Sequence, residues 1–99
     1  AEIDREGWTA LHYAAFGGNA AVIRLLIEKG ADRNRVAPNG YTPLMLAVRN
    51  RRYEAVREVL LWDPRLDIPG PAGETALSLA RGLEDAAIVA LLQRAGAAR

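Results

Sequence analysis

The chain has 99 residues, of which 51% are hydrophobic and 25% are charged, a balance typical of one globular domain spanning residues 1–99. Its formal net charge of +1 is too small to draw the whole chain to nucleic acid or to an acidic membrane surface. The absence of cysteine excludes disulfides and thiolate chemistry, and no apolar run is long enough to span a membrane.

The first predicted element is a turn followed by a short helix over about residues 9–16. Gly7 can adopt the positive φ that such a turn requires. Thr9 can cap the helix, because its hydroxyl accepts a hydrogen bond from a free N–H of the first turn. The Gly17-Gly18 pair ends the helix, as a left-handed C-terminal residue does.

A second helix is predicted over about residues 20–29, with Asn19 as its N-cap and Gly30 at its end. Its apolar side chains form a broad stripe: Val22, Ile23, Leu25, Leu26 and Ile27. A stripe this broad requires burial on both sides. No equivalent helix precedes it in the given sequence. We therefore expect one flank to be exposed or covered by a further unit of the same kind or by a second copy of the chain.

The same order of elements then recurs twice. The further helices are predicted at about residues 43–50, 53–62, 76–82 and 86–95. Asn39-Gly40 is a strong turn signal, and Pro43 stands at a first helical position, where its missing N–H costs nothing. Pro64 closes one helix and Asp85 caps another.

The recurrence has a fixed period. Gly7, Gly40 and Gly73 are 33 residues apart, and other columns keep this register, among them Leu11/Leu44/Leu77 and Ala14/Ala47/Ala80. A period of this length indicates stacked units, each too small to bury its own apolar face. The repeats are predicted at about residues 3–35, 36–68 and 69–99, each with a short helix A and a longer helix B.

The start of helix A carries a family resemblance. It reads Thr9-Ala10-Leu11-His12-Tyr13-Ala14, Thr42-Pro43-Leu44-Met45-Leu46-Ala47 and Thr75-Ala76-Leu77-Ser78-Leu79-Ala80. With the 33-residue period, this resembles the ankyrin repeat and its Thr-Pro-Leu-His-x-Ala signature. The resemblance implies an all-α solenoid, a stack of helix–turn–helix repeats joined by short β-hairpin fingers.

The chain departs from the family pattern at several positions. The histidine of the capping network occurs in repeat one alone. Arg51 and Glu84 replace Gly18, at a cost on the order of 1 kcal/mol for a left-handed non-glycine residue. Glu58 falls in the column of Leu25, so either that column is partly exposed or the repeat is locally weaker.

The resemblance implies a non-catalytic module that binds a partner protein, of unknown identity, through its fingers and the exposed face of helix A. Carried over by position, the partner-binding residues are Arg5, Glu6, Trp8, Phe16, Pro38, Asn39, Tyr41, Arg49, Asn50, Glu74 and Leu83. We expect Trp8, Phe16, Tyr41 and Arg49 at the centre, because large aromatics at positions outside the core suggest contact area. Packing between neighbouring fingers is an equal alternative for Trp8 and Tyr41.

Other functions have weaker support. A structural or capping segment of a longer repeat array is the alternative function. His12 is the only histidine and is interpreted as a helix-start residue, so no enzyme, metal or cofactor is predicted. Arg49, Arg51 and Arg52 are interpreted first as a solvated face and second as a surface for an anionic partner. We expect no nucleic-acid or membrane partner, a monomer or weak self-association through repeat one, and a cytoplasmic location.

Overall fold

The computed structural model describes residues 7–96, and within that range the chain forms six helices and no β-strand. The helices are α1 (Ala10–Gly17), α2 (Ala20–Glu28), α3 (Pro43–Arg49), α4 (Tyr53–Leu61), α5 (Ala76–Gly82) and α6 (Ala86–Arg94). The structure confirms the predicted all-α class and the order of the helices. Most predicted ends lie one residue beyond the observed ones.

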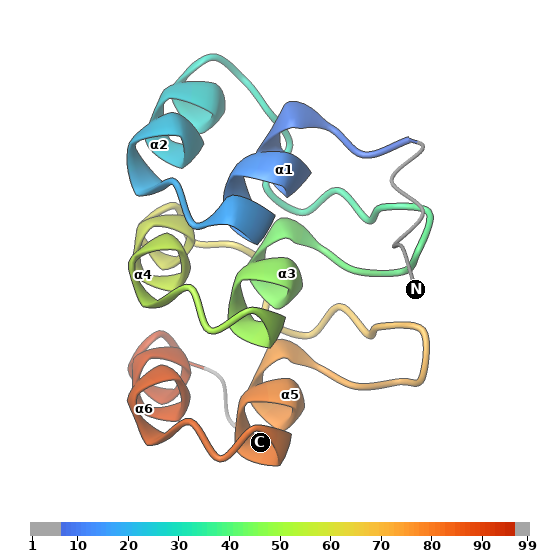
Figure 1. The fold of residues 1–99 in the computed structure, drawn as a ribbon, viewed down its shortest axis with the longest axis vertical. Coiled ribbons are helices and arrows are strands. Elements are labelled where there is room, and N and C mark those ends of the chain that lie inside the picture. Colours follow the sequence, from blue (N-terminus) through green and yellow to red (C-terminus); the bar gives the residue numbers. More distant parts are fainter. Residues whose placement is uncertain (1–6, 97–99) are drawn as a thin grey trace.

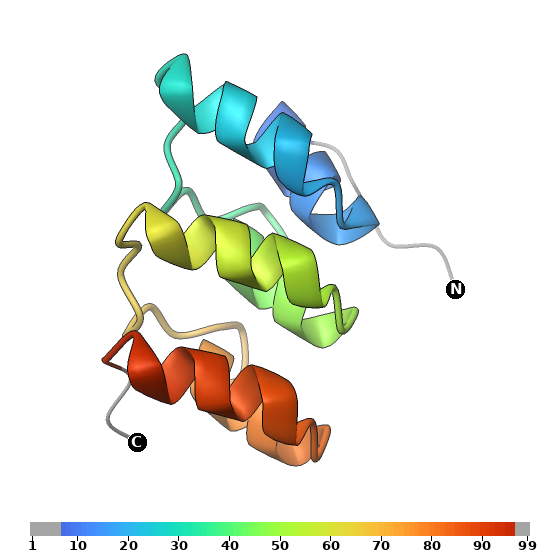
Figure 2. The same ribbon diagram turned by 90° about the vertical axis from the view of Figure 1, so that its left-hand side faces the viewer.

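The helices form two parallel rows (Figure 1). One row contains the helices A, which are α1, α3 and α5, and the other contains the helices B, which are α2, α4 and α6. Each helix A packs against its own helix B, and each helix also packs against its equivalent in the next repeat. Figure 2 shows the helices B as successive layers. The finger loops, which lead from each helix B to the next helix A, extend beyond the row of helices A on the side opposite the helices B (Figure 1).

A threonine caps each helix A, as predicted. The hydroxyls of Thr9, Thr42 and Thr75 accept hydrogen bonds from the backbone N–H three residues ahead, at 3.3, 3.2 and 3.2 Å. In repeats one and three the residue that follows three positions later, His12 or Ser78, reaches back to the threonine N–H. Ser78 therefore takes the role that His12 has in repeat one, and both residues complete a capping box. Helix α3 has the threonine cap, and no such second hydrogen bond is formed at its start.

The core lies between the two rows. Its tightest layer is α3, in which every residue from Pro43 to Val48 is buried. The in-phase alanines Ala14, Ala47 and Ala80 are 8%, 0% and 0% exposed, so this column lies in the core. A larger side chain at Ala47 would have to displace neighbours on both sides.

The turn after each helix A has the same left-handed backbone. Gly18 has φ 82°, and the residues in phase with it, Arg51 and Glu84, have φ 56° each. Asp63, in phase with Gly30, also has positive φ, at 54°. The stack therefore imposes one backbone geometry on residues that favour it to different degrees.

Neighbouring fingers pack glycine against proline. Gly7 and Gly40 have φ of 88° and 92°, so both need the conformational freedom of glycine. A Cβ on Gly7 would lie 2.6 Å from Cγ of Pro38, and a Cβ on Gly40 would lie 2.9 Å from Cδ of Pro71. Both members of the pair repeat at the 33-residue period, so the same close approach of one finger to the next occurs twice.

The stripe on α2 is buried on one side only. Ile23 and Ile27 are buried against the core, whereas Val22 and Leu25 are 37% and 50% exposed. Burial on both sides was therefore a wrong expectation, and the exposed flank was a correct one. The reason is that α2 has α4 as a neighbour in the row and no helix on its other side within residues 7–96.

Glu58 lies in a column that is partly exposed, which agrees with the first of the two interpretations. Although Leu25 is exposed at the equivalent position, Glu58 is buried. One carboxylate oxygen accepts a hydrogen bond from the indole N–H of Trp62 at 3.1 Å and lies 3.7 Å from Nε of Arg24. The buried carboxylate therefore has a hydrogen-bond donor on its own helix and a cation in the preceding repeat. Trp62 is half-buried and packs against the core.

Candidate functional site

On the finger side of the stack, a residue at the base of the finger contacts the end of helix A. In repeat one the ring of Trp8 meets the ring of Phe16 edge-on, with centroids 5.5 Å apart. In repeat two the guanidinium carbon of Arg49 lies 5.2 Å from the centroid of Tyr41. The two pairs occupy the same columns of the repeat. The contact is between two aromatic rings in repeat one and between a cation and a ring in repeat two.

Trp8 belongs to the core. Its side chain is 8% exposed, and its ring packs 5.2 Å from that of Tyr13 and 6.1 Å from that of His12, as well as against Phe16. The expectation that Trp8 lies outside the core is therefore wrong. These three ring contacts are all with residues of α1, in the same repeat as Trp8. Trp8 thus supports Phe16 and Tyr13 from beneath.

Tyr13 is a surface residue that the sequence interpretation missed. It is 46% exposed, whereas the in-phase residue Leu46 is fully buried. An aromatic residue with a polar tip, in a column otherwise occupied by Leu46 and Leu79, was the available signal. With the half-buried Phe16, it gives repeat one an aromatic surface.

Repeat two adds a cation to this surface. The backbone N–H of Tyr41 donates to the side-chain oxygen of Asn39 at 3.3 Å, which fixes the finger tip. Tyr41 is half-buried, and Arg49 and Pro38 are exposed. The contact between the guanidinium and the ring holds Arg49 over Tyr41 while both remain accessible.

The other basic residues of this region connect repeats. Nε of Arg52 and Nδ2 of Asn50 both donate to the backbone carbonyl of Phe16, at 3.1 and 3.4 Å. A terminal nitrogen of Arg51 donates to the carbonyl of Leu83 at 3.1 Å. Arg51 and Arg52 therefore do more than form a solvated face, because they join the α1, α3 and α5 ends into one layer.

Repeat three offers less at the same columns. Glu74 turns back to its own finger, where its carboxylate accepts from the N–H of Ala72 at 2.8 Å. Gly82 stands in the column of Phe16 and Arg49 and has no side chain. Leu83 is half-buried. The surface thus passes from aromatic to cationic to acidic along the stack. The predicted residues Arg5 and Glu6 lie outside the described residues.

His12 has the structural role predicted for it. Its Nδ1 accepts from the N–H of Thr9 at 3.1 Å, so Nε2 carries the proton that it shares with the carbonyl of Arg35 at 2.9 Å. Burial lowers the pKa of His12 below its ordinary value, against an opposing effect of the Arg35 carbonyl. Neutral His12 therefore links α1 to the start of the next finger, with both ring nitrogens occupied.

Two searches of residues 7–96 bear on other kinds of site. No group of three His, Asp or Glu side chains in that range lies close enough together to hold a metal ion. None of the helices there has the length and apolar character needed to cross a membrane.

Comparison with known proteins gives the same picture at the level of the sequence. The family model described as "Ankyrin repeats (3 copies)" matches residues 1–69. The B-cell lymphoma 3 protein homolog of Mus musculus is 37% identical over 93 residues, which are 93% of this chain and 21% of that protein. Ankyrin repeat and SOCS box protein 3 of Bos taurus is 49% identical over 43 residues, 43% of this chain and 8% of that protein.

A third relative is named an enzyme. The NAD-capped RNA hydrolase NUDT12 of Homo sapiens is 45% identical over 47 residues, 48% of this chain and 10% of that protein. This chain therefore spans between 8% and 21% of the length of these three relatives. The period, the capping threonines, the paired helices and the family model agree, and the chain belongs to the ankyrin repeat family.

Proposed function

We propose that this chain is a non-catalytic protein-interaction module that binds a partner protein through its fingers and the exposed face of the helices A. Ankyrin repeats are general protein-interaction modules. The observation that carries the proposal is the accessible pair of Arg49 and Tyr41, which lies one repeat away from Phe16. Tyrosine and arginine are among the residue types that most often dominate the binding energy of interfaces.

The packing beneath these residues supports the same proposal. Trp8 holds Phe16 from below, and the Arg49 contact restrains Tyr41, so both rings are ordered before a partner arrives. A surface that is already ordered loses less conformational entropy on binding. The proposed partner is a protein, with no nucleic acid, membrane or cofactor involved.

The proposed surface keeps the residues assigned by position and adds Tyr13. Its proposed members are Arg5, Glu6, Tyr13, Phe16, Pro38, Asn39, Tyr41, Arg49, Asn50, Glu74 and Leu83. Trp8 is retained as a supporting residue. The three repeats are proposed to act as one domain over residues 1–99, with no catalytic group.

The test is a double substitution, Tyr41→Ala with Arg49→Ala, assayed by quantitative capture of proteins from a lysate and by thermal unfolding. Hot-spot truncations cost about 2 kcal/mol or more in binding, whereas surface changes usually alter stability by less than about 0.5 kcal/mol. We therefore expect lost capture with a nearly unchanged Tm.

The matched control is Tyr53→Ala with Arg65→Ala, which removes the same residue types from exposed positions outside the finger and helix A surface. It should retain capture. Equal capture by both double variants would contradict the proposed surface, and loss of capture together with a lowered Tm would assign Tyr41 and Arg49 to the packing of the fingers.

The alternative, a segment of a longer repeat array, is favoured by the exposed flank of repeat one. Val22 and Leu25 are apolar and exposed on α2. Such a patch stabilises contact with a further repeat or with a second copy of the chain. Sedimentation should then show weak self-association that Leu25→Glu abolishes. A wild-type chain that stays monomeric at high concentration would remove the support for this alternative.

A further inference from the structure

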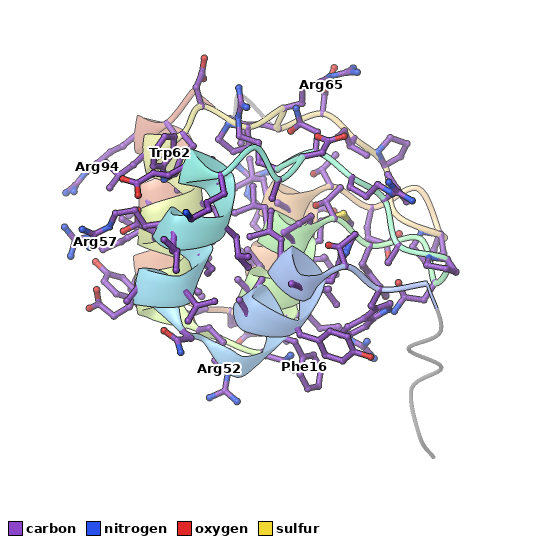
Figure 3. The ribbon with its side chains drawn as sticks, turned by 90° about the horizontal axis from the view of Figure 1, so that it is seen from above. Phe16, Arg52, Arg57, Trp62, Arg65 and Arg94 are labelled. Carbon is purple, nitrogen blue, oxygen red and sulfur yellow. The ribbon has the colours of Figure 1, made fainter. Side chains whose placement is uncertain are left out.

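The row of helices B carries a second feature, on a different side of the molecule from Phe16. Between the C-terminal ends of α4 and α6 lies a shallow hollow of about 220 Å³. Its lining is Arg57, Leu60, Leu61, Leu91, Arg94 and Ala95. Figure 3 shows Arg57 and Arg94 projecting from the same side of the stack, away from Phe16. Leu61 is 77% exposed, the largest exposed fraction among the exposed large hydrophobic residues described.

An equivalent hollow between α2 and α4 provides an internal comparison. It measures about 360 Å³, is lined by Arg24, Glu58, Leu61 and Trp62, and shares Leu61 as its common wall with the first. In it, a guanidinium of one helix meets a carboxylate of the next, because Glu58 lies 3.7 Å from Nε of Arg24. The indole N–H of Trp62 holds the same carboxylate at 3.1 Å.

The α4–α6 hollow keeps the arginine and lacks the acid. Arg57 is in phase with Arg24, but Leu91 is in phase with Glu58. The ion pair that Arg57 does form is with Glu54 on its own helix, at 3.6 Å, and both side chains are more than half exposed. Exposed pairs of this kind contribute little to stability. Within residues 7–96, Arg94 forms no ion pair.

The apolar part of the hollow is equally distinctive. Leu61 stands in a column whose other members, Glu28 and Arg94, are charged and exposed. Repeat two therefore exposes a leucine at a position where its neighbours expose charges. The hollow thus combines apolar walls with two guanidinium groups and contains no carboxylate of its own.

We propose that this hollow binds a short acidic segment of a partner protein, with an apolar side chain against Leu61 and carboxylates on Arg57 and Arg94. One of these carboxylates pairs with Arg57 as Glu58 pairs with Arg24 in the equivalent hollow. A guanidinium binds a carboxylate through two parallel hydrogen bonds, which favours carboxylates as ligands. The volume is below the roughly 300–1,000 Å³ of pockets for small molecules, and so it suits one anchoring side chain of a larger partner.

The test uses a fluorescein-labelled hexapeptide of alternating glutamate and leucine, titrated against the chain by fluorescence anisotropy. Amide chemical-shift mapping locates the bound peptide. We expect binding that weakens with added salt, because exposed charges are screened, and shifts confined to the ends of α4 and α6. Arg57→Gln with Arg94→Gln should weaken binding about tenfold or more, since bonds to charged groups are lost.

Two further variants sharpen the result. Leu91→Glu places a carboxylate opposite Arg57, as Glu58 stands opposite Arg24, and should also weaken binding by about tenfold or more. Arg65→Gln is the matched control, because Arg65 is equally exposed, is paired with Asp67 and lies on another edge of the molecule (Figure 3). It should leave the affinity unchanged. If Leu91→Glu unfolds the chain, the double arginine variant still decides the matter.

Several outcomes would overturn this inference. Equal affinity of the double arginine variant, shifts on the fingers, or no binding at millimolar peptide would each do so. An oligothymidine of the same charge that competes as well as the peptide would show charge attraction alone, as would equal binding of a glutamate–serine hexapeptide. The finger-face variant Tyr41→Ala with Arg49→Ala should not affect the peptide, so the two proposed surfaces are tested separately.

Discussion

Helices α1 and α3 begin with the same capping threonine and the same buried leucine, and yet they are buried to different extents. Every residue of α3 from Pro43 to Val48 is buried, whereas α1 leaves Tyr13 46% exposed. In the described chain, α3 packs against α1 and α5, and α1 packs against α3 alone in its row. The comparison teaches that burial in this stack is decided by the neighbouring repeats, because each repeat supplies only part of its own core.

The largest expected effect comes from enlarging an alanine at these two helices. Ala47→Leu should lower the free energy of unfolding by about 1–3 kcal/mol, because Ala47 is fully buried with a neighbour on each side. Ala14→Leu should cost less, since Ala14 is 8% exposed. Urea unfolding of both variants measures the difference. If both variants lowered the free energy of unfolding equally, the neighbouring repeats would not be what decides burial at these positions.

A smaller effect, limited to acid pH, is expected at the start of α1. The pKa of His12 is lowered in the folded chain by burial, so the unfolded chain takes up the proton first as the pH falls. The stabilisation by neutral His12 is complete above about pH 6.5, the ordinary pKa, and is lost as the pH falls from there through the lowered pKa. Unfolding measured across this range should show that loss.

The matched variant is His12→Met, which copies Met45 of repeat two. It should be less stable at neutral pH and should lack this part of the pH dependence. A wild-type chain and a His12→Met chain with the same pH profile between about pH 7 and 5 would show that His12 is not the group responsible.

The smallest effect is a gain at the left-handed turns. Glu84→Gly should stabilise the chain by up to about 1 kcal/mol, because glycine adopts φ of 56° without strain. The greater loss of backbone entropy by glycine on folding reduces this gain. Arg51→Gly should gain less, since it also removes the hydrogen bond to the Leu83 carbonyl. Thermal unfolding of the two single variants provides the measurement, and a larger gain for Arg51→Gly would show that this bond contributes nothing.

The sequence alone determined the features that depend on near neighbours in the chain. The 33-residue period, the capping threonines, Pro43 at the start of α3 and Asp85 before α6 all appear in the structure as predicted. A cap or a turn involves residues three or four positions apart, so its chemistry is complete within one short segment. The same reason made the left-handed backbone at Arg51 and Glu84 predictable, since their in-phase glycine identifies the position.

The tertiary structure alone decided which side chains are covered. Trp8 was expected at the surface and lies in the core, whereas Tyr13 was overlooked and is exposed. Glu58 could not be placed from its column, because its partners are Trp62 on its own helix and Arg24 in the preceding repeat. Burial depends on rotamers and on residues that the stack brings together from about one period away, and no local pattern records either.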